Sequence, residues 1–243
     1  MQREIKSEPK IRVRRYSGSA RFNHWVVAIC FILLMLSGFS LFHPSLYFIG
    51  QTLFGDGRTD RLLHPWIGLV LTVSFLGLFL RFFTANLPII TDFVWLSKSY
   101  YFVFGHEDYL PEVGKYNPGQ KFVFWSQAFL ILTLLASGIL LWGDVLPTAE
   151  RLTGYHATID IQRWAAIVHG SAAVLSIVVW VIHVYAAIWI RGSIDGMTRG
   201  TVTGGWGWRH HRKWLRKQAS QPSQIIEEPP TSDRREEATQ PAE

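Results

Sequence analysis

The chain has 243 residues, of which 49% are hydrophobic and only 17% are charged, and its formal net charge is +6. A soluble domain usually carries about a quarter charged residues, and the apolar residues here are gathered into long runs. Composition therefore excludes an ordinary soluble domain and indicates an integral membrane protein. The single cysteine, Cys30, excludes an intrachain disulfide and any metal site built from several thiolates.

Four apolar runs are long enough to cross a bilayer, which requires about 20 residues per helix. The first run does not resemble a cleavable signal peptide, because a long polar and basic segment precedes it and no small-residue cleavage site follows it. The sequence thus predicts an all-α fold, a four-helix transmembrane bundle within residues 24–190, with spans at Trp25–Phe42, Trp66–Phe83, Phe122–Trp142 and Trp164–Ile190.

Basic residues lie mainly on one side of the predicted spans. The N-terminal segment 1–23, the middle loop 84–121 with the nearby Arg81, and the segment 191–217 together hold 18 Lys and Arg, against 4 in the other two connections. Cytoplasmic loops of membrane proteins carry the excess of Lys and Arg. The distribution predicts both termini in the cytoplasm, and it explains the net charge by topology, so we expect no nucleic-acid partner.

The segments outside the spans differ in composition. The middle loop is longer than a simple connection requires, which is typical of functional loops. The basic segment 191–217 contains Trp residues and His210 and His211, and we expect it to rest on anionic lipid headgroups. The last segment, 218–243, is rich in Pro, Glu, Ser and Thr, which predicts a disordered tail.

A weak internal repeat relates the first and third spans. Six residues recur 100 positions later, which is compatible with duplication of a two-helix unit or with chance similarity between apolar helices. The first set is Phe22, Trp25, Leu34, Ser37, Gly38 and Leu41, and the second is Phe122, Trp125, Leu134, Ser137, Gly138 and Leu141.

Four of the nine histidines lie in or at the ends of predicted spans, where an ionisable side chain is costly and indicates function. His169 and His183 share the fourth span, 14 positions apart. That spacing corresponds to about 21 Å along a helix, with both rings on nearly the same face. The predicted topology puts His64 at the depth of His169, and His24 at the depth of His183. His43, His106 and His156 fall in loops or at a span end, where solvated or structural roles are expected.

Two histidine pairs at two depths favour two b-type haems, because each haem iron takes two opposed axial imidazoles. A site that needs three or four protein ligands fits less well, since no carboxylate lies in the predicted spans and Asp144 and Asp160 are expected in loops. A hydrogen-bonding role across helices remains the alternative for any single histidine. The glycines of the spans, Gly38, Gly68, Gly138 and Gly170, provide room for a flat macrocycle or for close helix packing.

The sequence around these histidines resembles the cytochrome b (gamma) subunit of respiratory membrane-bound formate dehydrogenase. The resemblance covers roughly residues 16–217 and rests on short motifs at Arg21–Trp25, Leu63–Pro65, Gly114–Lys121, Val168–Gly170, His183–Ala187 and near Arg191. Related hydrogenase b-type cytochromes share the four-helix, two-haem plan but are less similar in the Gly114–Lys121 loop.

The resemblance implies a function. His24, His64, His169 and His183 would be the axial ligands of two haems in a multi-pass protein of the bacterial inner membrane. An iron–sulfur (beta) subunit would supply electrons at the outer side, and a catalytic (alpha) subunit, not this chain, would oxidise formate. Electrons would then cross to a quinone, menaquinone or ubiquinone, near the cytoplasmic face. Asn117, Gly119 and Gln120 would line the quinone site, although Asn-Pro-Gly is also common in plain turns.

Two alternatives remain from the sequence. The chain could serve a nickel–iron hydrogenase or another quinone-linked oxidoreductase, since its outer loops determine the donor. It could also be a membrane anchor without a redox role.

Overall fold

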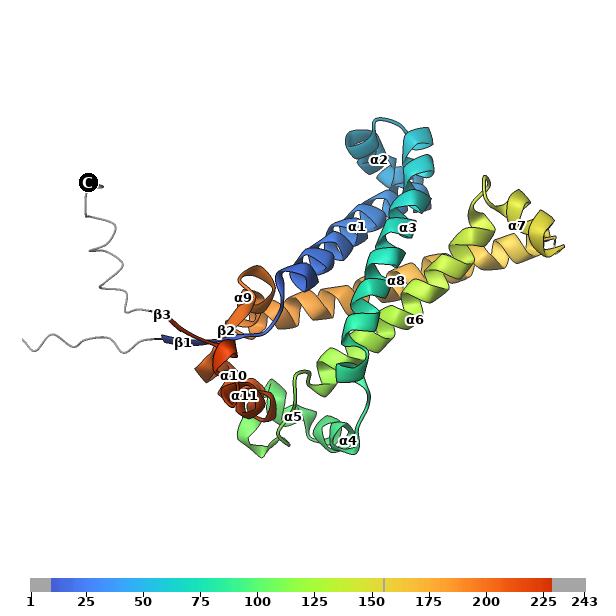
Figure 1. Ribbon diagram of the computed structural model, residues 1–243. Helices are drawn as coiled ribbons and strands as arrows, with labels where there is room; N and C mark the ends of the chain where they lie inside the picture. The colour runs from blue at the N-terminus through green and yellow to red at the C-terminus, as the bar shows by residue number, and fades with distance from the viewer. Residues whose placement is uncertain (1–9, 155, 229–243) are drawn as a thin grey trace, which may run out of the picture. The chain divides into compact units, whose positions relative to one another are not determined.

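The computed structural model describes residues 10–154 and 156–228. Internal contacts divide the chain into two compact units. We call residues 22–87 and 119–186 the span unit, and residues 10–21, 88–118 and 187–228 the terminal unit. Helices make up most of both units (Figure 1).

Four helices are long and apolar enough to cross a membrane, in agreement with the four predicted spans. Each helix begins several residues before its apolar run, because polar residues ahead of the run also adopt helical structure. In α3, for example, the Asp56 side chain accepts a hydrogen bond from the Thr59 amide, as an N-cap residue does. Asp160 therefore lies in the first turn of its helix, and its predicted loop position is wrong. The helices are α1 (Gly18–Phe42), α3 (Gly57–Phe82), α6 (Pro118–Leu141) and α8 (Ile159–Trp189).

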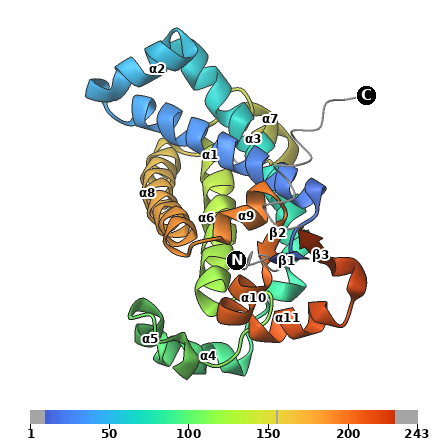
Figure 2. The same cartoon turned by 90° about the vertical axis from the view of Figure 1, so that its left-hand side faces the viewer.

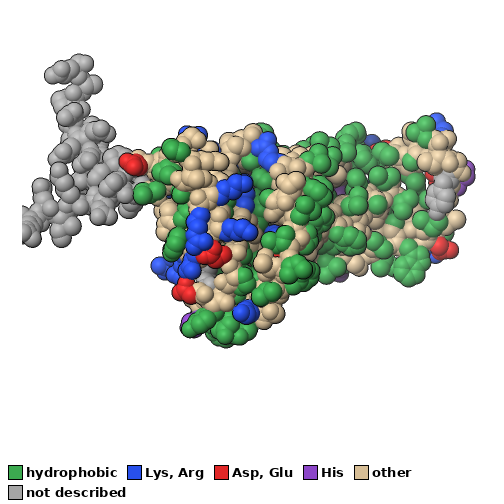
Figure 3. All heavy atoms as spheres, turned by 60° about the horizontal axis from the view of Figure 1, so that its bottom comes forward, with side chains coloured by type: hydrophobic (Ala, Val, Ile, Leu, Met, Phe, Trp, Pro, Cys, Tyr) green, Lys and Arg blue, Asp and Glu red, His purple; other side chains and the backbone are tan. Residues whose placement is uncertain are grey.

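Aromatic and small side chains pack the long helices of the span unit together. Phe79 of α3 stacks on Phe124 of α6 with 5.3 Å between ring centres. Ala172 of α8 is buried in a cluster with Leu130 of α6. Many apolar side chains on the outside stay exposed, such as Leu80 at 68%, and hydrophobic side chains cover much of the span surface (Figure 3). Such surfaces suit a lipid environment.

Short helices fill the connections between the spans. Pro118 starts α6 as its first residue, a position that proline favours, so the middle loop ends at Asn117 and not at Lys121 as predicted. Within that loop lie η2 (Thr84–Asn86), α4 (Ile90–Ser97), α5 (Ser99–Val103) and η3 (Glu107–Tyr109). The other connections hold η1 (Pro44–Leu46) and α2 (Tyr47–Phe54), and α7 (Leu146–Thr153).

The terminal unit contains a three-stranded antiparallel sheet, so the all-α prediction is wrong in this unit. Strand β1 (Lys10–Arg14) lies between β2 (Thr201–Thr203) and β3 (Ile225–Glu228). In the register, Val13 faces Val202 on one side and Ile225 on the other. The strands are short, and the partners of β1 lie far along the chain, since Arg12 pairs with Thr203 and with Ile226, so local pattern alone does not reveal them.

The sheet and the helices beside it bury their own core, formed by Val13, Val202, Trp206 and Trp214. Figure 2 shows α10 and α11 close to the sheet. Residues 218–228 thus belong to a folded unit and not to the predicted disordered tail, whose remaining part lies outside the described residues. The helical elements here are α9 (Ser193–Thr198), α10 (Gly204–His210), α11 (Arg212–Ala219) and η4 (Pro222–Gln224).

Gly200 lies between the C-cap of α9, Arg199, and the first residue of β2. Its φ is +82°, and an added Cβ atom would lie 2.9 Å from the Tyr16 carbonyl oxygen. Its own carbonyl accepts hydrogen bonds from the amides of Arg15 and Tyr16. Only glycine meets both requirements without strain.

Candidate functional site

The four span histidines form two pairs in the span unit. The ring centres of His64 and His169 are 6.3 Å apart, and those of His24 and His183 are also 6.3 Å apart. These are the pairs that the depth argument predicts. His24, His64 and His169 are half-buried and His183 is exposed.

Three helices hold these rings. His24 lies on α1 and His64 on α3, whereas α8 supplies both His169 and His183. Because α8 is one continuous helix, their spacing of 14 positions becomes a separation of about 21 Å along its axis. The two pairs therefore form two layers along α8.

A serine from a neighbouring helix contacts each histidine of the first pair. The Ser37 hydroxyl of α1 lies 2.7 Å from His64 Nδ1, and the Ser137 hydroxyl of α6 lies 3.0 Å from His169 Nδ1. Both serines are buried, Ser37 completely. The prediction of the site from sequence missed them, although the Ser-Gly pair of the internal repeat pointed to them.

Glycines follow both serines and approach the same rings. A Cβ atom added at Gly38 would lie 3.7 Å from His64 Cε1, and one added at Gly138 would lie 3.4 Å from His169 Cε1. The two other predicted glycines face apolar side chains, Gly68 facing Leu34 and Gly170 facing Phe42. Gly38 and Gly138 are thus the two span glycines beside the histidines.

The second pair has a different surrounding. His24 Nδ1 is buried and has no hydrogen-bond partner among the described residues. The edge of the Trp25 ring lies nearby, with 5.7 Å between the ring centres. In the part of the chain that the structure describes, no serine therefore forms with His24 Nδ1 the hydrogen bond seen in the first pair.

The predicted quinone residues lie where the middle loop meets α6. Asn117 is buried and directly precedes the helix, while Gly119 and Gln120 lie in its first turn. The neighbouring Lys121 is buried, and its ammonium group donates to the Leu87 carbonyl oxygen at 3.0 Å. Lys121 thus links the start of α6 to the segment after α3, and this contact supports the fold.

His211 is the buried histidine of the terminal unit, with 1% of its surface exposed. Its Nδ1 lies 2.8 Å from the Gly114 carbonyl oxygen, and its Nε2 lies 3.3 Å from Nη2 of Arg15. The same Arg15 atom donates to the Lys115 carbonyl oxygen at 2.7 Å, and the guanidinium stacks on Trp206 and Trp214. The predicted headgroup position of His211 is therefore wrong, since a charged neighbour and a backbone acceptor hold the ring inside the unit.

Burial governs ionisation in this network. Burial, the charge of Arg15 and the nearby His210 lower the pKa of His211 well below its usual value, against the opposing hydrogen bond to Gly114. Burial and then Arg15 also lower the pKa of Lys115. His211 is therefore neutral near pH 7, with both ring nitrogens engaged.

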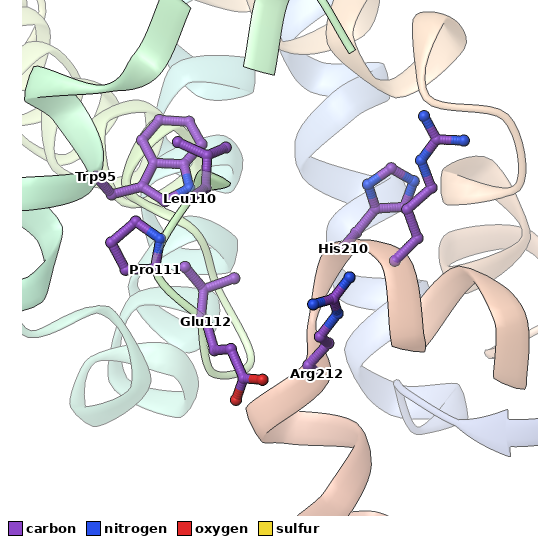
Figure 4. A pocket seen from close by; sticks show the side chains of 8 residues that line it. Trp95, Leu110, Pro111, Glu112, His210 and Arg212 are labelled. Carbon is purple, nitrogen blue, oxygen red and sulfur yellow. The ribbon is translucent and has the colours of Figure 1, made fainter. Parts of the chain in front are cut away.

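The terminal unit also has a small surface pocket, lined by residues of the middle loop and of α10 and α11 (Figure 4). Its volume is about 30 Å³, far below the roughly 300 Å³ or more of small-molecule sites. Glu112 at its edge forms a two-bond ion pair with Arg216. The pocket contains none of the span histidines, and it is too small to hold a quinone.

Comparison with known proteins identifies the family. Residues 15–200 match the family described as prokaryotic cytochrome b561. The chain is 37% identical to the cytochrome b556 subunit of nitrate-inducible formate dehydrogenase from Escherichia coli K12, over 80% of this chain and 86% of the relative. It is 36% identical to a second formate dehydrogenase cytochrome b556 subunit of that organism, over 84% and 92%. For the Haemophilus influenzae subunit the identity is 31%, over 85% and 84%.

The chain belongs to the cytochrome b subunits of formate dehydrogenase. Membership implies electron transport and a b-type haem, and the residues of this cytochrome b fit such a group. A metal between two opposed imidazoles lies about 2 Å from each ring nitrogen, which puts the ring centres about 6 Å apart. Both histidine pairs have that separation. Among the described residues, no cluster of three or more His, Cys, Asp or Glu offers an alternative metal site.

Proposed function

We propose that this cytochrome b holds two b-type haems, one between His64 and His169 and one between His24 and His183. The chain would take electrons from an iron–sulfur subunit at the outer side of the bacterial inner membrane and deliver them to a quinone near the cytoplasmic side. Formate oxidation would take place on a separate catalytic subunit. The two histidine pairs with equal 6.3 Å separations are the observation that carries this proposal.

The distribution of Lys and Arg supports the orientation. The basic segments flank the α1 end that carries His24 and the α8 end that carries His183, and the positive-inside rule puts those ends in the cytoplasm. His64 and His169 would then lie toward the outer side. Because α8 carries a ligand of each layer, one helix would set the spacing of the two groups.

The loop before α6 supports a quinone site on the same side as His24 and His183. Asn117 and Gln120 have amide side chains that can donate hydrogen bonds to a quinone carbonyl oxygen, and Gly119 leaves the helix start open to a ligand. The first helix turn also presents backbone N–H groups without intrahelical acceptors. Whether the quinone is menaquinone or ubiquinone depends on contacts beyond these three residues.

When bound, the haems would supply one-electron carriers at two depths. The protein's part is to hold the histidines in position and to orient the quinone. The short helix α2 lies between α1 and α3, which carries His64, and α7 lies between α6 and α8, which carries His169. Both lie on the opposite side of the spans and would meet the iron–sulfur subunit.

The test is the haem content of the purified full-length chain in lipid nanodiscs. Two haems per chain, with reducible b-type absorption bands, are expected. One haem or none would overturn the proposal, and a chain without haem would favour the membrane-anchor alternative. His156→Ala serves as the control, because this exposed side chain contacts only Glu150 among the charged groups described.

The donor is tested separately in membranes that contain the whole complex. Formate should reduce the b-type haems and then the quinone pool, and removal of this chain should abolish quinone reduction. Reduction by hydrogen instead of formate would favour the hydrogenase alternative. The relatives named above are subunits of formate dehydrogenase, which favours formate.

A further inference from the structure

The Ser-Gly pairs on α1 and α6 meet the two histidines of one layer in the same way. Ser37 and Gly38 of α1 face His64, and Ser137 and Gly138 of α6 face His169. In each case the serine reaches Nδ1 of the ring and the glycine lies beside Cε1. The internal repeat of the sequence thus places the same Ser-Gly contacts on both members of a single histidine pair.

The hydrogen-bond directions follow from a second contact of each serine. The Ser37 hydroxyl donates to the Leu34 carbonyl oxygen at 3.2 Å, and the Ser137 hydroxyl donates to the Thr133 carbonyl oxygen at 2.7 Å. A hydroxyl has one proton to donate. Each serine oxygen therefore accepts a hydrogen bond from Nδ1–H of its histidine, and this tautomer leaves the Nε2 lone pair available. His169 also has a hydrogen bond to the Leu134 backbone, so loss of the serine should act more strongly at His64.

We infer that Ser37 and Ser137 are positioning residues that fix the tautomer and rotation of His64 and His169 and lower the reduction potential of the haem between them. This inference rests on the proposed function. A hydrogen bond accepted from the distal ring nitrogen makes a ligating histidine more basic, and a more basic ligand favours ferric over ferrous iron. Because both ligands of the same haem donate such a hydrogen bond, their effects add on one haem.

The other layer supports the inference by contrast. His24 Nδ1 has no hydrogen-bond partner among the described residues, so the same stabilisation of ferric iron is missing on that ligand. The layer with the serines would thus be the weaker electron acceptor of the two. In the proposed orientation it lies nearer the donor, so this order of potentials drives electrons along α8 toward His24 and His183.

The test uses Ser37→Ala and Ser137→Ala in the full-length chain with both haems bound, and it measures the two haem potentials by spectroscopic redox titration. Each substitution should raise the potential of one haem and leave the other unchanged, and both substitutions should act on the same haem. Electron paramagnetic resonance should show a changed ligand field for that haem alone. Ser37→Thr, which keeps the hydroxyl, should restore the original potential.

Thr133→Val is the matched control, because it removes a hydroxyl one turn from Ser137 that donates only to the Phe129 carbonyl oxygen. If an alanine variant does not assemble, Ser37→Cys keeps the side-chain size with a weaker acceptor and should shift the same haem in the same direction. Unchanged potentials, or shifts of different haems by the two serine substitutions, would overturn the inference. A chain without haem would instead refute the proposed function.

Discussion

Both units of the molecule contain histidines that are at least half-buried, but they use the rings differently. In the span unit, Nδ1 of His64 forms a hydrogen bond with Ser37, and the ring lies next to that of His169. In the terminal unit, Gly114 and Arg15 engage both nitrogens of His211. A histidine with one nitrogen available can serve as a ligand, whereas one with both nitrogens engaged can only support the fold.

This difference shows that burial alone does not identify a ligand histidine. The deciding property is what faces the second nitrogen: another imidazole across a helix interface, or a hydrogen-bonding partner of the protein. His211 lies beside a cation, which makes metal binding there still less favourable. The two uses of histidine should therefore respond differently to substitution.

The largest effect is expected from loss of a span histidine. His64→Ala and His169→Ala should each remove the same haem, and His24→Ala and His183→Ala should each remove the other. The reason is that one remaining axial imidazole holds haem much more weakly than two. Haem content per chain and the optical spectrum measure this, with His156→Ala as the control. Removal of different haems by His64→Ala and His169→Ala would break the pairing.

A smaller effect is expected at the start of α6. Asn117→Ala and Gln120→Ala should each lower quinone reduction by roughly 2- to 10-fold, the value of one hydrogen bond, with both haems still bound. Quinone reduction by formate in membranes is the measurement. Gln221→Ala, an exposed amide between α11 and η4, should change nothing. Full activity of both loop variants would contradict the proposed site.

In the terminal unit, His211→Ala should destabilise the fold by about 1–3 kcal/mol, because it removes the partner of the half-buried Gly114 carbonyl oxygen. Haem content should stay at the wild-type value. Limited proteolysis or amide hydrogen exchange of the full-length chain measures the loss. A variant that loses haem while the terminal unit keeps its protection would remove the distinction between the two units.

The same histidine should make the stability of the terminal unit depend on pH. Burial and Arg15 lower the pKa of folded His211, so below about pH 6.5 the unfolded chain takes up a proton that the folded chain does not. Stability should therefore be constant above that pH and fall by up to about 1.4 kcal/mol per pH unit below it. Hydrogen exchange at about pH 7.5 and about pH 5.5 tests this, and His211→Gln should weaken the dependence.

The smallest effect is expected at the glycines beside the first histidine pair. An added Cβ at Gly38 meets His64 at an ordinary contact distance of 3.7 Å, so Gly38→Ala should fold and even gain up to about 1 kcal/mol of helix stability. If haem needs this space, its affinity should fall in the same variant. Gly68→Ala, next to Leu34, is the control, and haem titration is the measurement.

Much of the span unit could be predicted from the sequence. Apolar runs with a fixed length requirement reveal transmembrane helices directly, and Lys and Arg set the expected order of their ends. Once four helices alternate in direction, His64 and His169 fall at one depth, as do His24 and His183. The helix starts were missed because hydropathy ends at the first polar residue, whereas α3 continues to its cap at Asp56.

The terminal unit was missed for a physical reason. Its sheet joins β1 to strands near residues 202 and 226, and a short strand has little periodicity by which to recognise it. Residues 218–228 have a composition typical of disorder, but pairing with β1 gives part of this segment its hydrogen-bond partners. The basic composition of segment 191–217 likewise suggested a surface position for His211. In the structure, the neighbouring Arg15 lies over the rings of Trp206 and Trp214.

The sequence by itself determined the number of spans, the expected side of the basic segments and the four span histidines, because each depends on composition or on spacing along a single helix. Only the tertiary structure decided which hydroxyls reach His64 and His169, that His24 Nδ1 lacks such a partner among the described residues, and that His211 is buried against Arg15. These contacts join segments up to 196 positions apart. Which side chains meet at such distances depends on how the helices and strands pack, and no periodicity in the chain encodes it.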